Sequence, residues 1–109
     1  MSDVSVNQDN TKQTVRGIHS AIARALEKIG LTAEGYAKKK CPVDTGRLRN
    51  SITHQSDGKE SVYIGTDVEY GPYVELGTHK QAAQPFLRPA AENHASTYRK
   101  ILQDELKNG

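Results

Sequence analysis

Apolar residues in the first half of the chain recur at steps of three and four, the spacing that places side chains on one face of an α-helix. The stripe stays in phase through Gly30 and Gly35, which predicts one long helix over residues 13–40, with a possible bend near Gly30. Pro42 ends it, because proline disfavours helical geometry at the preceding residue. The stripe consists of Val15, Ile18, Ile22, Leu26, Ile29, Ala33, Tyr36 and Ala37.

Short alternating runs in the middle of the chain are typical of β-strands. Residues 51–54 and 61–64 flank the pair Asp57-Gly58, a strong hairpin signal because such pairs favour the tight turns between antiparallel strands. A third run, YVEL at residues 73–76, places its valine and leucine on the same face. The pattern predicts a small antiparallel sheet, three-stranded or slightly larger, with one face packed on the long helix.

The remaining segments complete a predicted α+β fold. Residues 77–88 (GTHKQAAQPFLR) show no period and are expected to form a long loop, which in so small a domain usually has a function or is mobile. Pro89 suits the first turn of a C-terminal helix. Residues 1–12 are polar and are interpreted as a flexible tail before a single domain, 13–109. The stripe of the last helix is Ala91, Ala95, Tyr98, Leu102 and Leu106.

Composition narrows the chemistry that this domain could perform. Apolar residues are 35% of the chain, so the core is thin, and association with partner subunits is a common way to bury more surface. A formal net charge of +2 is too close to neutral to indicate a nucleic-acid-binding protein. The lone Cys41 cannot form an internal disulfide, and the four histidines are scattered. We therefore expect no cofactor and no metal.

The distribution of apolar residues also predicts no membrane partner. No run of about 18 apolar residues could span a bilayer, and no apolar core of a signal peptide follows Met1. A soluble chain made in a reducing compartment is expected.

The tripeptide Asp44-Thr45-Gly46 carries the catalytic carboxylate of aspartic proteases, some of which are homodimers of chains about this long. That chemistry needs the carboxylate in a tight loop between strands, paired with its copy from a second subunit. Here a predicted helix precedes the tripeptide. Arg47 follows it, and its charge would lower the carboxyl pKa and oppose the shared proton. A homodimeric aspartic protease is therefore kept only as an alternative.

A structural joint accounts for more of these residues. Asp44 or Thr45 would cap a short helical turn beginning at Gly46, with a side-chain oxygen accepting a backbone N–H two or three residues on. Leu48 and Ile52, four residues apart, would then face the core, while Arg47 and Arg49 point outward. The predicted joint comprises Pro42, Asp44, Thr45, Gly46 and Leu48.

Three short blocks follow one another along the chain: PVDTGRL at 42–48, Tyr70 with YVELGT at 73–78, and QPFLRPA at 84–90. In this order and spacing they resemble a family of small head–tail joining proteins of long-tailed phages, known as tail components, neck proteins or tail-completion proteins. The resemblance covers about residues 15–105. It implies a structural α+β subunit of a phage or prophage, not an enzyme, at the virion neck or tail, assembled in the host cytoplasm.

The same resemblance implies partners. Copies of the chain would form a ring between the connector or head-completion protein and the tail terminator or tail tube. The genome would pass through without specific binding, which suits the near-neutral charge. A small nucleic-acid-binding domain that uses residues 38–40 and the arginines is a second alternative, with an affinity that falls steeply with salt.

Residues 77–88 are a candidate arm for such a ring. Gly77 frees the backbone, Pro85 stiffens it, and Phe86 with Leu87 supplies an apolar anchor. Alternatively, Phe86 and Leu87 pack into their own subunit and only the tip, 78–83, is exchanged. The full candidate interface is Arg47, Arg49, Tyr73, Glu75, Gly77, Thr78, His79, Lys80, Pro85, Phe86 and Arg88.

Charged residues of this interface leave several pairings open. Arg47 and Arg49 are expected to pair with carboxylates of neighbouring subunits rather than with DNA, with a solvated surface as the alternative. Glu75 could meet Arg47 or Arg88, within a subunit or across an interface.

Overall fold

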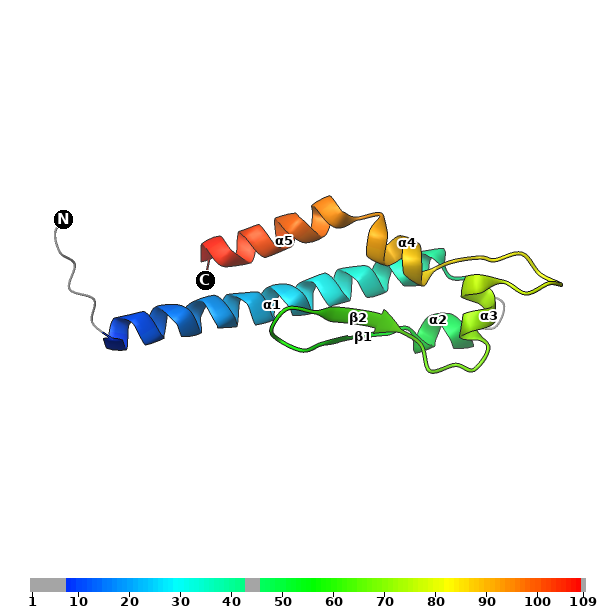
Figure 1. Cartoon of the computed structure of the whole chain (residues 1–109). Helices are drawn as coiled ribbons and strands as arrows, with labels where there is room; N and C mark the ends of the chain where they lie inside the picture. The colour runs from blue at the N-terminus through cyan, green and yellow to red at the C-terminus, as the bar shows by residue number, and fades with distance from the viewer. Residues whose placement is uncertain (1–7, 43–45, 109) are drawn as a thin grey trace.

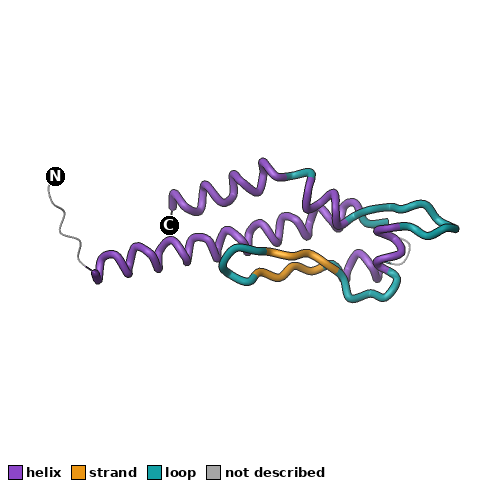
Figure 2. Tube along the Cα trace, viewed as in Figure 1, coloured by secondary structure: helices purple, strands orange, loops and turns teal. Residues whose placement is uncertain are grey.

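The computed structural model describes residues 8–42 and 46–108, and one long helix sets its shape (Figure 1). Helix α1 (Gln8–Lys40) is about 50 Å long at 1.5 Å per residue, and the molecule measures 69 × 23 × 21 Å. The β-hairpin lies along one side of α1, and the C-terminal helices lie along another (Figure 2). Helix α1 is therefore the support on which the other layers are built.

Helix α1 is continuous, as predicted, but it begins at Gln8 rather than at residue 13. Residues 8–12 therefore belong to the helix and not to the predicted tail, while residues 1–7 of that tail lie outside the described residues. A polar segment can extend a helix that tertiary packing has already nucleated, because each added residue gains a backbone hydrogen bond. An apolar stripe therefore marks where a helix is buried and not where it starts.

The joint after α1 leads into the short helix α2 (Arg47–Ser51). Gly46 precedes it with a φ of 81°, a left-handed conformation that glycine adopts without steric cost. Leu48 and Ile52 are buried at 4% and 1% exposure, which confirms that they face the core. The predicted caps at 44 and 45 lie outside the described residues.

The sheet is an antiparallel hairpin of β1 (Thr53–Ser56) and β2 (Val62–Gly65), which confirms the turn between them. Gly58 has a φ of 72°. One carboxylate oxygen of Asp57 accepts the three backbone N–H groups of residues 59–61 at 2.9–3.0 Å. These hydrogen bonds lower the pKa of Asp57 to about 2, and the bond from the N–H of residue 61 has the largest effect. The side chain of Asp57 thus holds the turn.

The predicted third strand is wrong, because residues 73–76 belong to helix α3 (Gly71–Leu76). Pro72 lies in its first turn, where a fixed φ favours helix and the missing N–H costs nothing. Gly71 is buried, and a Cβ there would lie 2.6 Å from Cγ2 of Thr66. A four-residue alternation is too short to distinguish a strand from a helical turn. The sheet of the described residues therefore has two strands.

The predicted C-terminal helix is divided into α4 (Leu87–Glu92) and α5 (Ala95–Asn108). Pro89 lies in the first turn of α4, as expected. His94 at the break stacks on Tyr36 of α1, with ring centroids 3.5 Å apart and planes 8° from parallel. This tertiary contact fixes where the chain bends back along α1 (Figure 1).

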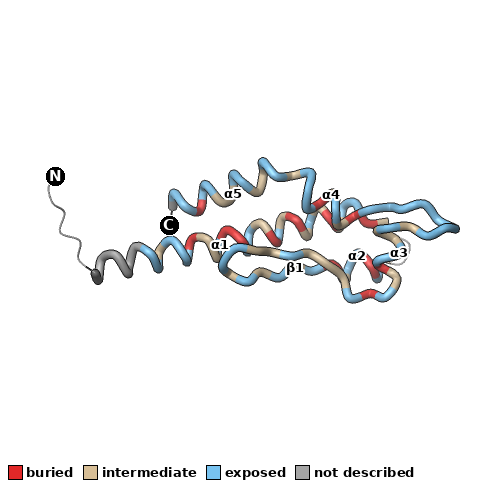
Figure 3. Tube along the Cα trace, in the orientation of Figure 1, coloured by how far each residue is buried: buried red, intermediate tan, exposed pale blue. Residues whose placement is uncertain are grey.

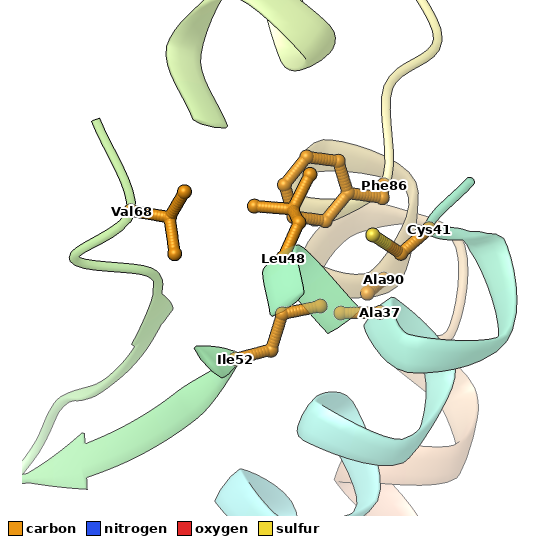
Figure 4. Packing of buried hydrophobic residues seen from close by; sticks show 7 residues of the cluster. All are labelled: Ala37, Cys41, Leu48, Ile52, Val68, Phe86 and Ala90. Carbon is orange, nitrogen blue, oxygen red and sulfur yellow. The ribbon is translucent and has the colours of Figure 1, made fainter. Parts of the chain in front are cut away.

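The main core lies at the C-terminal end of α1, where this helix meets α2, the loop that carries Val68, and the start of α4 (Figure 4). Phe86 and Ile52 are its largest fully buried side chains, and Ala37, Cys41 and Ala90 are its small ones. A line of buried positions, Ala21, Ala25, Leu26 and Ala33, extends from it along α1 (Figure 3). The core residues are Ala37, Cys41, Leu48, Ile52, Val68, Phe86 and Ala90.

An ion-pair cluster joins α5 to the N-terminal half of α1. The carboxylate of Glu105, only 7% exposed, accepts hydrogen bonds from Nε of Arg24 at 3.2 Å and Nζ of Lys28 at 2.7 Å. These hydrogen bonds lower the pKa of Glu105, and the bond from Lys28 has the largest effect. Its stabilising effect is therefore present at neutral pH and is lost as pH falls through that lowered pKa.

Gly30 marks the closest approach of the hairpin to α1. A Cβ at this position would lie 2.4 Å from Cδ2 of His54 and 2.9 Å from Cγ2 of Val62, both of the hairpin. Gly35 lies on an exposed part of the same helix, and a Cβ placed there would have no atom within 4 Å. Of these two helical glycines, only Gly30 is required for packing.

We expect Gly30→Ala to lower the free energy of unfolding by about 1 kcal/mol, because overpacking at about 1–3 kcal/mol exceeds the roughly 1 kcal/mol gain in helix propensity. Gly35→Ala improves helix propensity without a packing cost, so it should raise the free energy of unfolding by about 0.5–1 kcal/mol. Urea unfolding followed by circular dichroism measures both. Equal stabilisation by the two substitutions would contradict the close packing at Gly30.

Candidate assembly surface

The loop after α3 projects from one end of the molecule, where Figure 1 shows it in yellow. Gly77 has a φ of 78°, and the positions from 78 to 85 are all exposed. Thr78 and Gln81 exchange backbone hydrogen bonds of 2.9 and 3.2 Å, and the Thr78 hydroxyl also accepts the backbone N–H groups of Lys80 and Gln81. We call residues 77–85 the arm; its first half is an ordered turn.

Glu75 fixes the base of the arm. Its carboxylate accepts the backbone N–H groups of Phe86, Leu87 and Arg88 at 2.9, 2.8 and 3.1 Å. These groups lie at the start of α4, where the helix itself supplies no acceptor. The N–H of Gln84 also donates to the carbonyl of Val74 at 2.8 Å. The two ends of the arm are thereby held together.

Within the subunit, the described contacts of the Glu75 carboxylate are with backbone N–H groups and not with an arginine side chain. The guanidinium of Arg88 lies 3.2 Å from the carboxylate of Glu92 instead. A pairing of Glu75 across an interface stays a prediction. No local sequence pattern reveals the role of Glu75, because the cap comes from a residue more than ten positions before the helix that it caps.

Phe86 is completely buried in the core of its own subunit. Phe86 therefore packs into its own subunit and is not exposed for an interface, while exchange of the tip stays a prediction. Leu87 is half-buried beside it, while Thr78, His79, Lys80 and Pro85 remain exposed on the arm. The base of the arm thus seals the core, and its tip is available for contact.

Arg47 has a carboxylate partner within its own subunit, and its pairing with a neighbouring subunit stays a prediction. Its guanidinium binds both carboxylate oxygens of Glu69, at 3.1 and 2.9 Å, and lies 5.5 Å from the ring centroid of Tyr70. The hydrogen bonds from Arg47 lower the pKa of Glu69. Both side chains are largely exposed, as is Arg49. Exposed ion pairs of this kind orient side chains more than they stabilise a fold.

An apolar groove of about 510 Å³ lies beside the base of the arm. Ile29 and Ala33 of α1 line it together with residues 62–64 of β2 on one side and residues of α4 and α5 on another. Two of the lining side chains are exposed for most of their surface, Tyr63 at 65% and Leu76 at 77%. The sequence did not reveal this groove, because it is formed by elements that meet only after folding.

The described neighbours of the Asp-Thr-Gly tripeptide do not support a protease. Helix α1 precedes it and helix α2 follows it, whereas the catalytic loop requires flanking strands. Among the described residues, no group of three or more histidine, cysteine or acidic side chains is placed to hold a metal ion. Over the same residues, no helix combines the length and apolar character needed to cross a membrane.

The nucleic-acid alternative also lacks support from the described structure. Lys38, which heads its proposed basic run, lies 3.2 Å from the carboxylate of Glu34.

Residues 8–77, more than half of the chain, match the family model described as "Bacteriophage HK97-gp10, putative tail-component". The chain belongs to this family. The match runs from the start of α1 to the end of α3, so it contains the block at 42–48 and most of the block at 70–78. The predicted resemblance to phage tail components is thus confirmed, and the block at 84–90 lies beyond the match. No curated protein and no solved structure matches this HK97-gp10-like chain.

We expect Glu75→Ala to lower the free energy of unfolding by about 1–3 kcal/mol, because three part-buried or terminal amides of α4 lose their acceptor. Glu92→Ala is the matched control, since it removes only an exposed pair on the same helix and should change stability by less than about 0.5 kcal/mol. Urea unfolding measures both variants. Limited trypsinolysis at Lys80 should also become faster in Glu75→Ala alone; similar behaviour of the two variants would contradict this role.

Proposed function

We propose that this chain is a structural, non-enzymatic virion protein of a tailed phage or prophage that joins copies of itself into a ring at the head–tail junction. The ring would lie between the connector or head-completion protein and the tail terminator or tail tube. It would be assembled in the host cytoplasm and would remain at the neck or tail of the virion. Membership of a phage tail-component family supports this assignment.

The observation that carries the proposal is the open apolar groove beside the arm. Leu76 is 77% exposed and immediately precedes the arm, and it lines the same groove as Tyr63. Interface centres are enriched in aromatic residues, and a few well-packed residues near the centre carry most of the binding free energy. A chain with so thin a core gains stability when a neighbouring subunit covers this surface.

A ring requires two different surfaces on each subunit, because a heterologous contact closes into a circle after a fixed number of copies. The arm and the groove are two such surfaces on one chain. The near-neutral charge suits a channel through which nucleic acid must pass, since a strongly basic lining would hold the phosphate backbone. The charges of Arg47 and Glu69 also offset each other in an exposed ion pair.

Size-exclusion chromatography with light scattering, across a range of concentrations, tests the proposal with the chain alone and mixed with its connector and tail-terminator partners. We expect association, and we expect Leu76→Lys to weaken it by at least about tenfold, because a charge would replace an apolar anchor. Leu31→Lys is the matched control, since Leu31 is 55% exposed on α1 and is not among the residues that line the groove.

Circular dichroism should show that both leucine variants fold like the parent chain. A parent chain that stays monomeric at all concentrations and ignores both partners would refute the assembly role. Equal loss of association in Leu76→Lys and Leu31→Lys would refute the placement of the interface at the groove.

A further inference from the structure

His54 of β1 sits against Gly30 of α1 and contacts a carboxylate on each side of that glycine. Its Nδ1 is 2.9 Å from Oε1 of Glu34, and its Nε2 is 2.6 Å from Oε1 of Glu27. Residues 27, 30 and 34 lie on one face of the helix, since three- and four-residue steps place side chains above one another. The imidazole is only 12% exposed, so α1 forms a fitted site for this ring.

The two contacts specify the protonation state of the ring. A neutral imidazole has one N–H donor and one acceptor nitrogen, whereas the imidazolium donates from both. An ordinary buried histidine would pair its second nitrogen with a donor, but here both partners are carboxylates. The hydrogen bonds to Glu34 and then Glu27 raise the pKa of His54, and burial opposes them. The site therefore selects the charged form.

Among the described residues, the charged groups that contact the ring come from α1. Lys38 lies 3.2 Å from Oε2 of Glu34, so the sequence of charges is Lys38, Glu34, His54, Glu27, alternating in sign. Strand β2 contributes only Val62, Tyr63, Ile64 and Gly65, of which the tyrosine is exposed. Loss of the proton from His54 leaves two carboxylates against one lysine and places a lone pair opposite a carboxylate oxygen.

We propose that His54 is a proton-operated latch that fastens the β-hairpin to α1, and that its deprotonation loosens the hairpin and the groove wall that the hairpin supplies. His54 pairs with Ile64 across the hairpin, and Ile64 and Val62 line the groove. The ring lies directly against the backbone of α1, since a Cβ at Gly30 would come within 2.4 Å of its Cδ2. A weaker latch therefore acts on the position of β2.

The sign of the pH dependence follows from the raised pKa. Below about 6.5, the ordinary pKa of a histidine in an unfolded chain, the latch contributes its full stabilisation. That stabilisation is lost as pH rises through the higher pKa of the folded protein. Each unit by which folding raises the pKa corresponds to about a tenfold change in the equilibrium constant for opening of the hairpin.

Two NMR measurements on the free chain test the latch. A titration of the histidine ring signals should give His54 a pKa above the ordinary histidine value of about 6.5. Amide hydrogen exchange, corrected for intrinsic rates, should show hairpin protection falling between pH 6 and 9 in the parent chain and in His79→Gln, the matched control. In His54→Gln, whose amide donates to only one carboxylate, protection should be lower at pH 6 and independent of pH.

Glu27→Gln provides a second test that does not alter the packed ring, because Glu27 is 57% exposed. It should lower the pKa of His54 and reduce the pH dependence of hairpin protection. A pKa of His54 at or below about 6.5 would overturn the proposal. Hairpin protection that depends on pH as strongly in His54→Gln as in the parent chain would also overturn it. If His54→Gln does not fold, the same comparison is made with Glu27→Gln.

Discussion

The fold depends on how closely the other layers can approach α1. Alanine and glycine occupy many of its buried positions, at 21, 25, 30, 33 and 37, so the hairpin and α5 come near the helix axis. Such contacts bury little apolar surface per residue, and their stabilisation is correspondingly modest. Each layer is therefore also held by a polar contact: His54 between two glutamates for the hairpin, and Glu105 with Arg24 and Lys28 for α5.

This arrangement places the main core and the proposed binding surface toward the same end of the molecule. The main core, the arm and the groove all lie near the C-terminal end of α1, whereas Val15 and Ile18 near its other end are 43% and 48% exposed. A chain of this shape has a well-packed end, the head, near the C-terminus of α1, and a long helical extension. Contacts with partners at the head of the chain would be made by surfaces whose backbone is already ordered, which limits the entropy lost on binding.

Local patterns in the sequence predicted the elements whose stabilising contacts are themselves local. The apolar stripe of α1 and the Asp57-Gly58 turn report on backbone geometry within a few residues. Residues 73–76 were misread because their helical state depends on Pro72 and on the burial of Gly71. The break before α5 depends on stacking of His94 on Tyr36, and the cap of α4 depends on Glu75. These last contacts join residues far apart in the chain, so no periodicity records them.

The position of Glu75 next to Leu76 connects the order of the arm to the groove. Glu75 is fixed by three backbone N–H groups on the far side of the arm, and Leu76, the next residue, ends α3 at the margin of the groove. A partner that pulls the arm away from α4 would therefore strain these hydrogen bonds and shift Leu76. Conversely, a partner seated in the groove would hold Leu76 and stabilise the base of the arm. Occupation of the groove should thus favour the ordered base of the arm, whereas displacement of the arm should disfavour it, because both depend on the same cap.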